Sequence, residues 1–200
     1  MRTHATRTRA FSLIEVLIAL TITATLLTAT LAALDASFKS YKYTTDSAST
    51  HVVARIVTQR VTAMIRTGRR FGPYPVNPIT TPELESDWIE FVSYSDPAAG
   101  VEVVTRLERR DSPGDTGPYA LWYVGTRSEG GSVVSTEEYP LLDRLTELKF
   151  ILEYEVGPHL TRATMDMIIQ PDDMEDASIS TSLDAPTIRM VASAAPRQEG

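Results

Sequence analysis

A mostly apolar run extends from residue 11 to residue 34, where Glu15 is the only ionisable side chain. Its five threonines are expected to bond back to helix carbonyls one turn earlier, so they do not forbid a lipid environment. A helix of this length would reach about 36 Å, which exceeds the roughly 30 Å of a bilayer's hydrocarbon core. Arginines precede the run and Asp35 follows it, which predicts a cytoplasmic N-terminus. The pattern therefore predicts a membrane-spanning helix. A buried core helix or an ordinary cleaved secretory signal fits the length less well.

Helical periodicity continues beyond this run to about residue 66. Apolar residues recur on two adjacent lines of the helix surface, one with Ala48, Val52 and Ile56 and the other with Val53, Val57, Val61 and Met64. Gly68 and the arginines at 66, 69 and 70 predict the helix end, with cations at the negative end of its dipole. The second half of the helix, residues 35–68, would then offer the stripe between Val52 and Ile65 to the rest of the chain.

The basic cluster at residues 66–70 has two interpretations. Capping of the helix end together with solvation explains it best. Contact with an anionic lipid or an acidic partner is the alternative.

Residues 69–192 are predicted to form a β-rich domain. Period-two or aromatic-rich stretches occupy residues 88–94, 101–108, 119–125, 145–155, 163–170 and 187–192. Turn-forming sequences such as SDPAAG, SEGGS and EVGPH separate them. This spacing predicts an antiparallel sheet whose apolar face, with Trp88 and Trp122 in the core, takes the helix stripe. The predicted fold class is α+β, with a flexible tail at residues 193–200.

The amino-acid composition excludes some classes of function but does not identify one. The net charge is −7, and removal of residues 1–10 leaves −10, because the three arginines of that segment account for +3. An acidic body argues against a nucleic-acid-binding role based on bulk positive charge. Cysteine is absent, so the β-rich domain is not held by disulfides.

Candidate chemistry is sparse. His4, His51 and His159 are far apart in sequence, and no G-x-S-x-G motif or phosphate-binding glycine loop accompanies them, so catalysis finds no support. An acidic stretch at 170–178 could collect Ca²⁺ through Asp172, Asp173, Glu175 and Asp176. Its spacing is not that of an EF-hand, so a solvated acidic loop is the preferred interpretation and no cofactor is expected.

Glu15 is the residue that the bulk pattern does not explain. A charged group in lipid needs a partner, yet residues 10–38 contain no Lys or Arg. The nearest cation that could be made is the free amine created by cutting the chain before Phe11. A short basic leader, a small residue, Phe-Ser-Leu-Ile-Glu and an apolar span together resemble the type IV pilin and pseudopilin precursors.

The resemblance assigns roles to individual residues. A membrane-embedded prepilin peptidase would cut between Ala10 and Phe11 and methylate the new N-terminal Phe11, while Arg7 and Arg9 would hold the leader (residues 1–10) in the cytoplasm. Glu15 would pair with the N-terminal amine of a neighbouring subunit during assembly. Alanine stands where the family usually has glycine before the cut, which predicts slower processing.

Within that family, the length and the β-rich outer domain resemble the J-type minor pseudopilin of type II secretion. Such subunits sit at the tip of a periplasmic pseudopilus with I- and K-type companions, and Glu15 weighs against the K-type. Ala32 stands where many major pilins carry proline. A minor pilin of a type IV pilus or DNA-uptake filament is the alternative. A signal-anchored periplasmic binding protein or enzyme is the alternative from another class.

Overall fold

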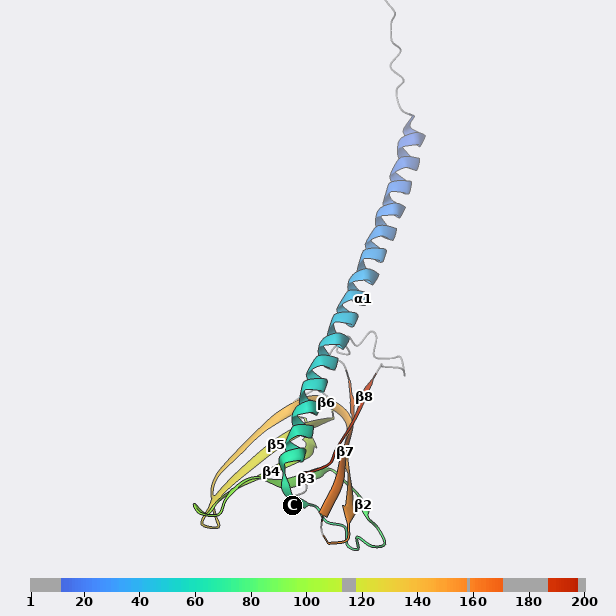
Figure 1. The fold of residues 1–200 in the computed structure, drawn as a ribbon. Coiled ribbons are helices and arrows are strands. Elements are labelled where there is room, and N and C mark those ends of the chain that lie inside the picture. Colours follow the sequence, from blue (N-terminus) through green and yellow to red (C-terminus); the bar gives the residue numbers. More distant parts are fainter. Residues whose placement is uncertain (1–11, 113–117, 158, 171–186, 198–200) are drawn as a thin grey trace, which may run out of the picture. The chain divides into compact units, whose positions relative to one another are not determined.

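The computed structural model of the protein describes residues 12–112, 118–157, 159–170 and 187–197. The chain divides into two compact units, residues 1–45 and 46–200. Helix α1 (Leu13–Thr67) runs through the first unit and continues into the second (Figure 1). The long N-terminal helix expected from the sequence is therefore confirmed.

The second unit contains an antiparallel sheet, which confirms the α+β fold class. Its strands follow the order β1-β3-β4-β5-β6-β7-β8, and β2 pairs separately with β6. Strands β3 to β8 match the predicted stretches to within one residue at residues 170 and 187 and extend beyond them elsewhere, whereas the four-residue strands β1 and β2 were not predicted. The bounds are β1 Arg69–Gly72, β2 Glu83–Ser86, β3 Trp88–Asp96, β4 Val101–Asp111, β5 Tyr119–Glu129, β6 Ser132–Glu155, β7 His159–Ile169 and β8 Ile188–Ala194.

Strand β6 is one long arc that connects strands β1, β3, β4 and β5 to strands β2, β7 and β8 (Figure 1). Its residues 132–145 pair with β5, while residues 145–155 pair with β7 and residues 150–153 with β2. Register shifts lie on both sides of Leu145, and Arg144 adopts a positive φ of 63°. Such bulges bend a strand, so one segment can serve both parts of the sheet. The sequence prediction began this strand at residue 145 and missed its first half.

The core lies between the second half of α1 and one face of the sheet. Ala54, Val57, Val61 and Ile65 are buried on the helix side. The fully buried sheet side chains that meet them include Ile89, Phe91, Leu107, Leu121, Leu148, Phe150, Met165 and Met167. The helix and the sheet therefore share one core, as predicted.

The predicted helix stripe is only partly correct. Val57 and Val61 are buried as expected, but Val52, Val53 and Ile56 are 58%, 49% and 59% exposed. The buried line instead begins at Ala54, which the sequence analysis had not selected. A small side chain there lets the helix approach the sheet closely, since packed interiors leave few voids.

Gly68 ends α1 as predicted. Its backbone N–H donates to the carbonyls of Met64 and Ile65 at 2.9 and 3.3 Å, which satisfies orphan groups of the last turn. A Cβ at this position would lie 2.6 Å from Cδ2 of Phe91 and 2.9 Å from Cζ of Phe71. Glycine is therefore required by close packing under two aromatic rings.

Candidate functional site

The first turn of α1 holds the acidic residue that the sequence singled out. Glu15 lies in that turn, and its Oε2 accepts a hydrogen bond of 2.9 Å from the backbone N–H of Ser12. The N–H of Val16 donates to the carbonyl of Ser12 at 3.2 Å, so Ser12 is the residue that precedes the helix. This bond from the Ser12 N–H to the Glu15 side chain is one of the two hydrogen bonds of a capping box. A negative side chain here also complements the helix dipole.

The capping role of Glu15 was not predicted from the sequence. The signal was present as Ser-Leu-Ile-Glu, which has the S-x-x-E spacing of a capping box ahead of an apolar run. Glu15 therefore has two separable properties, a local hydrogen bond to Ser12 and a negative charge at the start of an apolar helix. Ala10, Phe11, Arg7 and Arg9, which the processing prediction names, lie outside the described residues.

The side chains of the helix that follows Glu15 are exposed throughout the first unit wherever they are described. Every described side chain from residue 12 to residue 42 is exposed. The large apolar ones include Leu17 at 56%, Leu26 at 63% and Leu31 at 57%. In the described part of the chain, α1 is the one helix long and apolar enough to cross a membrane. A continuous apolar surface of this size marks a segment that lipid or another protein covers.

Threonine side chains do not interrupt this apolar helix, because each returns its hydroxyl to the helix backbone. The five bonds, each 2.8 or 2.9 Å long, run from Thr21 to the Ile18 carbonyl, Thr23 to Ala19, Thr25 to Ile22, Thr28 to Ala24 and Thr30 to Leu26. No hydroxyl among these five needs a hydrogen bond from water. The predicted back-bonding is confirmed, and it removes the main objection to a lipid environment.

The first ion pair along the described helix lies just beyond the predicted span. Lys39 Nζ and Asp35 Oδ2 are 3.0 Å apart, one turn from each other. Charged side chains recur from this point, at Asp35, Lys39, Lys42 and Asp46. The predicted end of the span at residue 34 fits this change, and the domain boundaries stay predictions.

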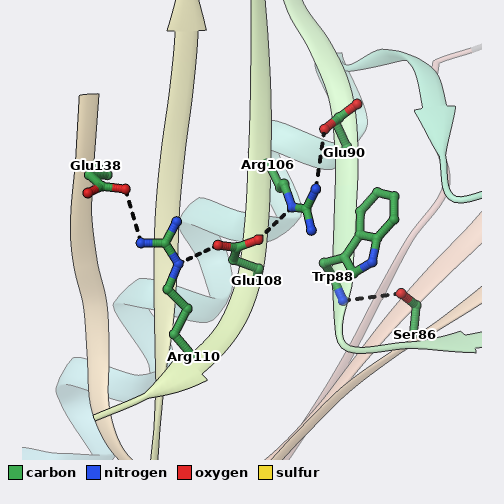
Figure 2. A network of polar contacts seen from close by, with 7 residues as sticks. All are labelled: Ser86, Trp88, Glu90, Arg106, Glu108, Arg110 and Glu138. Carbon is green, nitrogen blue, oxygen red and sulfur yellow. Dashed lines mark hydrogen bonds and ion pairs between the residues drawn. The ribbon is translucent and has the colours of Figure 1, made fainter. Parts of the chain in front are cut away.

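The sheet carries a second cluster of polar side chains, on the face that points away from α1 (Figure 2). Glu108 in β4 bridges two arginines, with Oε2 at 2.5 Å from Nε of Arg106 and Oε1 bonded to Nε of Arg110. Arg110 also donates to Glu138 of β6 at 3.0 Å, and Arg106 lies 4.0 Å from Glu90. The hydrogen bond to Glu108 raises the pKa of the Arg110 guanidinium.

Both tryptophans belong to this outer face, so their predicted place in the core is wrong. The guanidinium of Arg106 lies 4.2 Å from the ring centre of Trp88, and that of Arg110 lies 5.0 Å from Trp122. Strand alternation explains the difference, because Ile89 and Phe91 take the inward positions beside Trp88. Cation–π stacking and ion pairs cover the rings in place of a core.

The two histidines within the described residues lie in different elements. His51 is exposed on α1 and His159 begins β7. Among the residues the structure describes, no group of three or more His, Asp or Glu side chains is placed to hold a metal ion. The calcium candidates Asp172, Asp173, Glu175 and Asp176 lie outside the described residues, so that prediction stays open.

Comparison with known families finds one match. A model described as the prokaryotic N-terminal methylation motif matches residues 6–31, which contain the second half of the basic leader, the Phe-Ser-Leu-Ile-Glu sequence and most of the apolar run. No curated protein and no solved structure shows significant similarity to the chain. The match supports a type IV pilin-like precursor that prepilin peptidase processes and the membrane anchors. Such a motif suggests a structural subunit rather than an enzyme.

Proposed function

We propose that the chain is a minor pilin-like subunit that assembles at the tip of a type II secretion pseudopilus. Prepilin peptidase cuts between Ala10 and Phe11 and methylates Phe11. The helix stays in the inner membrane with its N-terminus cytoplasmic and the β-rich domain in the periplasm. The partners are the peptidase, the other minor and major pseudopilins and the membrane lipid.

One observation carries the proposal, namely the position of Glu15 in the first turn of a bare apolar helix. A carboxylate removed from water costs several kcal/mol unless a cation pairs with it. Among the described residues, the neutral N–H of Ser12 is the hydrogen-bond donor to Glu15, and residues 10–38 contain no Lys or Arg. Cleavage before Phe11 creates the missing cation at the same end of the helix.

The arrangement also favours a polymer over a closed dimer. Each processed subunit offers one amine and one carboxylate close together at a helix end. If the amine of one subunit pairs with the carboxylate of the next, the contact joins two different surfaces. Such heterologous contacts generate helical filaments when the rotation does not close.

The assignment to type II secretion rests on the β-rich outer domain and on Glu15, which weighs against a K-type subunit. A minor pilin of a type IV pilus or DNA-uptake filament shares the same processing and is the second candidate. The third is a signal-anchored periplasmic binding protein or enzyme. Neighbouring genes for a secretin and for I- and K-type companions would distinguish the first two.

The test uses two substitutions that separate the charge of Glu15 from its capping role. Glu15→Gln keeps an acceptor for Ser12, because glutamine also completes a capping box, whereas Glu15→Ala removes both properties. We expect both variants to insert in the membrane and both to lose at least about tenfold in assembly, measured by crosslinking to companion subunits.

Two results would contradict the proposal. Normal assembly of Glu15→Gln would leave capping as the only role of the acid. An unmodified Met1 in the mass spectrum of the membrane-extracted wild-type protein would favour the signal-anchored alternative over a processed subunit.

A further inference from the structure

We propose that a proline-rich loop of the second unit docks into an apolar groove, bordered by basic side chains, on a partner protein. The loop comprises residues 73–82, PYPVNPITTP, which connect β1 to β2, and we call it the proline loop. It contains no charged residue, although 22% of the chain is charged. All the residues that the proposal uses belong to the second unit, so it does not rest on cleavage before Phe11.

Both ends of the proline loop are held by one residue, Tyr154 of β6. Its hydroxyl donates to the carbonyl of Pro73 at 2.8 Å, and its backbone N–H donates to the carbonyl of Pro82 at 2.8 Å. Its ring also lies 5.7 Å from the ring of Tyr74. Because Tyr154 is buried in the core, the loop begins and ends at a fixed place on the domain. Compact surface loops whose ends meet in this way commonly carry binding functions.

The interior of the proline loop is restrained as well. Four of its ten residues are proline, which holds φ at about −65° and disfavours the helical region for the residue before it. The side-chain oxygen of Asn77 accepts hydrogen bonds from the N–H groups of Ile79 and Thr80 at 3.1 and 3.4 Å. The Asn77 carbonyl accepts another from the N–H of Thr81 at 2.9 Å. A loop restrained in this way loses little conformational entropy when it binds, which lowers the cost of association.

The restrained loop presents apolar side chains to solvent. Val76 is fully exposed, Ile79 is 73% exposed and Tyr74 is 51% exposed. These exposed groups do not stabilise the isolated domain, because an apolar side chain contributes to stability when it is removed from water. Burial in an apolar groove of a partner accounts for the restraint of the loop and for the exposure of its side chains together.

The charges beside the proline loop favour a protein groove over a membrane surface. Strand β2 follows the loop and carries the exposed residues Glu83 and Glu85. Glu83 lies opposite Glu153 of β6, and Arg162 binds both carboxylate oxygens of Glu153 at 2.7 and 2.6 Å. The nearby guanidinium is therefore engaged by Glu153. Anionic lipid would be repelled by Glu83 and Glu85, whereas basic side chains at the rim of a groove would complement them.

The first experiment identifies the partner in intact cells. The full chain is produced in its own host with the photoreactive residue benzoylphenylalanine in place of Ile79, and the cells are irradiated. We expect position 79 to be joined to one protein, at a segment of apolar residues with basic residues beside it, as read by mass spectrometry. The same probe in place of Val133, which is 65% exposed on β6, should give at least about tenfold less of this adduct.

The second experiment measures the affinity of that purified protein for the full chain in detergent micelles by fluorescence anisotropy. Val76→Ser with Ile79→Ser should weaken binding at least about tenfold, because two buried apolar contacts are lost. The matched control, Val133→Ser with Val134→Ser, changes exposed valines of β6 and should alter binding less than about twofold.

Two further double variants test the restraint and the charge. Pro75→Ala with Pro78→Ala keeps the apolar side chains but frees the backbone, so it should weaken binding at least about threefold. Glu83→Gln with Glu85→Gln should weaken binding and reduce its dependence on salt, as a basic rim requires.

Three outcomes would overturn the proposal. The first is an adduct at position 79 that contains lipid alone, which would assign the proline loop to the membrane surface. The second is an amount of protein adduct at position 79 no greater than that at position 133. The third is an equal loss of affinity in the two serine double variants, which would show that the loop has no special part in binding.

Discussion

Gly68 is the position where the structure makes the sharpest prediction about stability. Its neighbours leave no room for a methyl group, because an added Cβ would lie 2.6 Å from Cδ2 and 2.9 Å from Cγ of Phe91. Phe91 is fully buried, and its ring packs against Phe71 with centroids 5.4 Å apart. Gly68→Ala must therefore displace an aromatic pair in the core or shift the end of α1.

The expected cost follows from overpacking. Forcing an extra methyl group into a well-packed core costs about 1–3 kcal/mol. For a domain of this size, each kcal/mol corresponds to about 2–4 °C in Tm, so the expected decrease is roughly 2–12 °C. Gly72→Ala is the matched control, since its Cβ would have only Trp88 Cζ3 within 4 Å, at 3.9 Å. Neither glycine has a positive φ, so backbone strain does not separate the two variants.

The assay is thermal unfolding of the full chain in detergent, followed by tryptophan fluorescence. Trp88 and Trp122 both lie in the sheet, so the signal reports the second unit. In a Phe91→Ala background, which removes both Cδ2 and Cγ, Gly68→Ala should cost at least about 1 kcal/mol less, because contacting residues are coupled. Equal Tm values for Gly68→Ala and Gly72→Ala, or additive effects in the double variant, would refute the reasoning.

Three further predictions concern charged and buried polar groups. In urea unfolding, Glu108→Gln should lower the free energy of unfolding by about 1–2 kcal/mol, because this largely buried carboxylate bridges two arginines. The control Glu90→Gln, in an exposed ion pair at 4.0 Å, should lower it by less than about 0.5 kcal/mol. Hydrogen bonds from Arg189 at 3.0 and 2.7 Å lower the pKa of Asp166. The pair therefore stabilises the fold at pH values above the ordinary Asp pKa, and this stabilisation is lost as the pH falls through the lowered pKa of Asp166. Asp166→Asn should therefore flatten the fall in Tm below about pH 4, and an unchanged slope would contradict this. Burial raises the pKa of Tyr154, so stability should fall as pH rises above about 10, and Tyr154→Phe should reduce that fall in alkaline melts.

The sequence predicted those elements whose signal is local. The helix end at Gly68 was readable because glycine and nearby cations mark such ends. The hairpin turn at Gly130 and Gly131, which have φ of 57° and 83°, was readable for a similar reason. Strand β6 was only half predicted, since residues 132–140 are almost all exposed and Pro140 suggests a break.

What the sequence could not decide was which of two faces is buried. On α1, Val52 and Ile56 form as good an apolar line as Val57 and Val61, and only the sheet selects between them. On β3, Trp88 and Ile89 are neighbours of similar apolar character that point to opposite faces. The stacking of Arg106 on Trp88 and the ion pair between Arg106 and Glu90 join β4 to β3, so these partners follow from the register of the two strands.

The two units differ in what stabilises them, and this difference bears on Glu15. The second unit has its own core, whereas none of the described side chains from residue 12 to residue 42 is buried. An isolated helix is only marginally stable in water, so lipid or neighbouring helices must cover this part of α1. In the proposed assembly the same cover removes Glu15 from water. The hydrogen bond that the described residues provide, from the amide of Ser12, does not offset this loss of hydration. Residues 10–38 contain no Lys or Arg, so the proposal takes the counter-charge from the amine that cleavage before Phe11 would create on a neighbouring subunit. Glutamine at this position keeps the hydrogen bond and needs no counter-charge, so the Glu15→Gln variant separates the local role of the acid from its role between subunits.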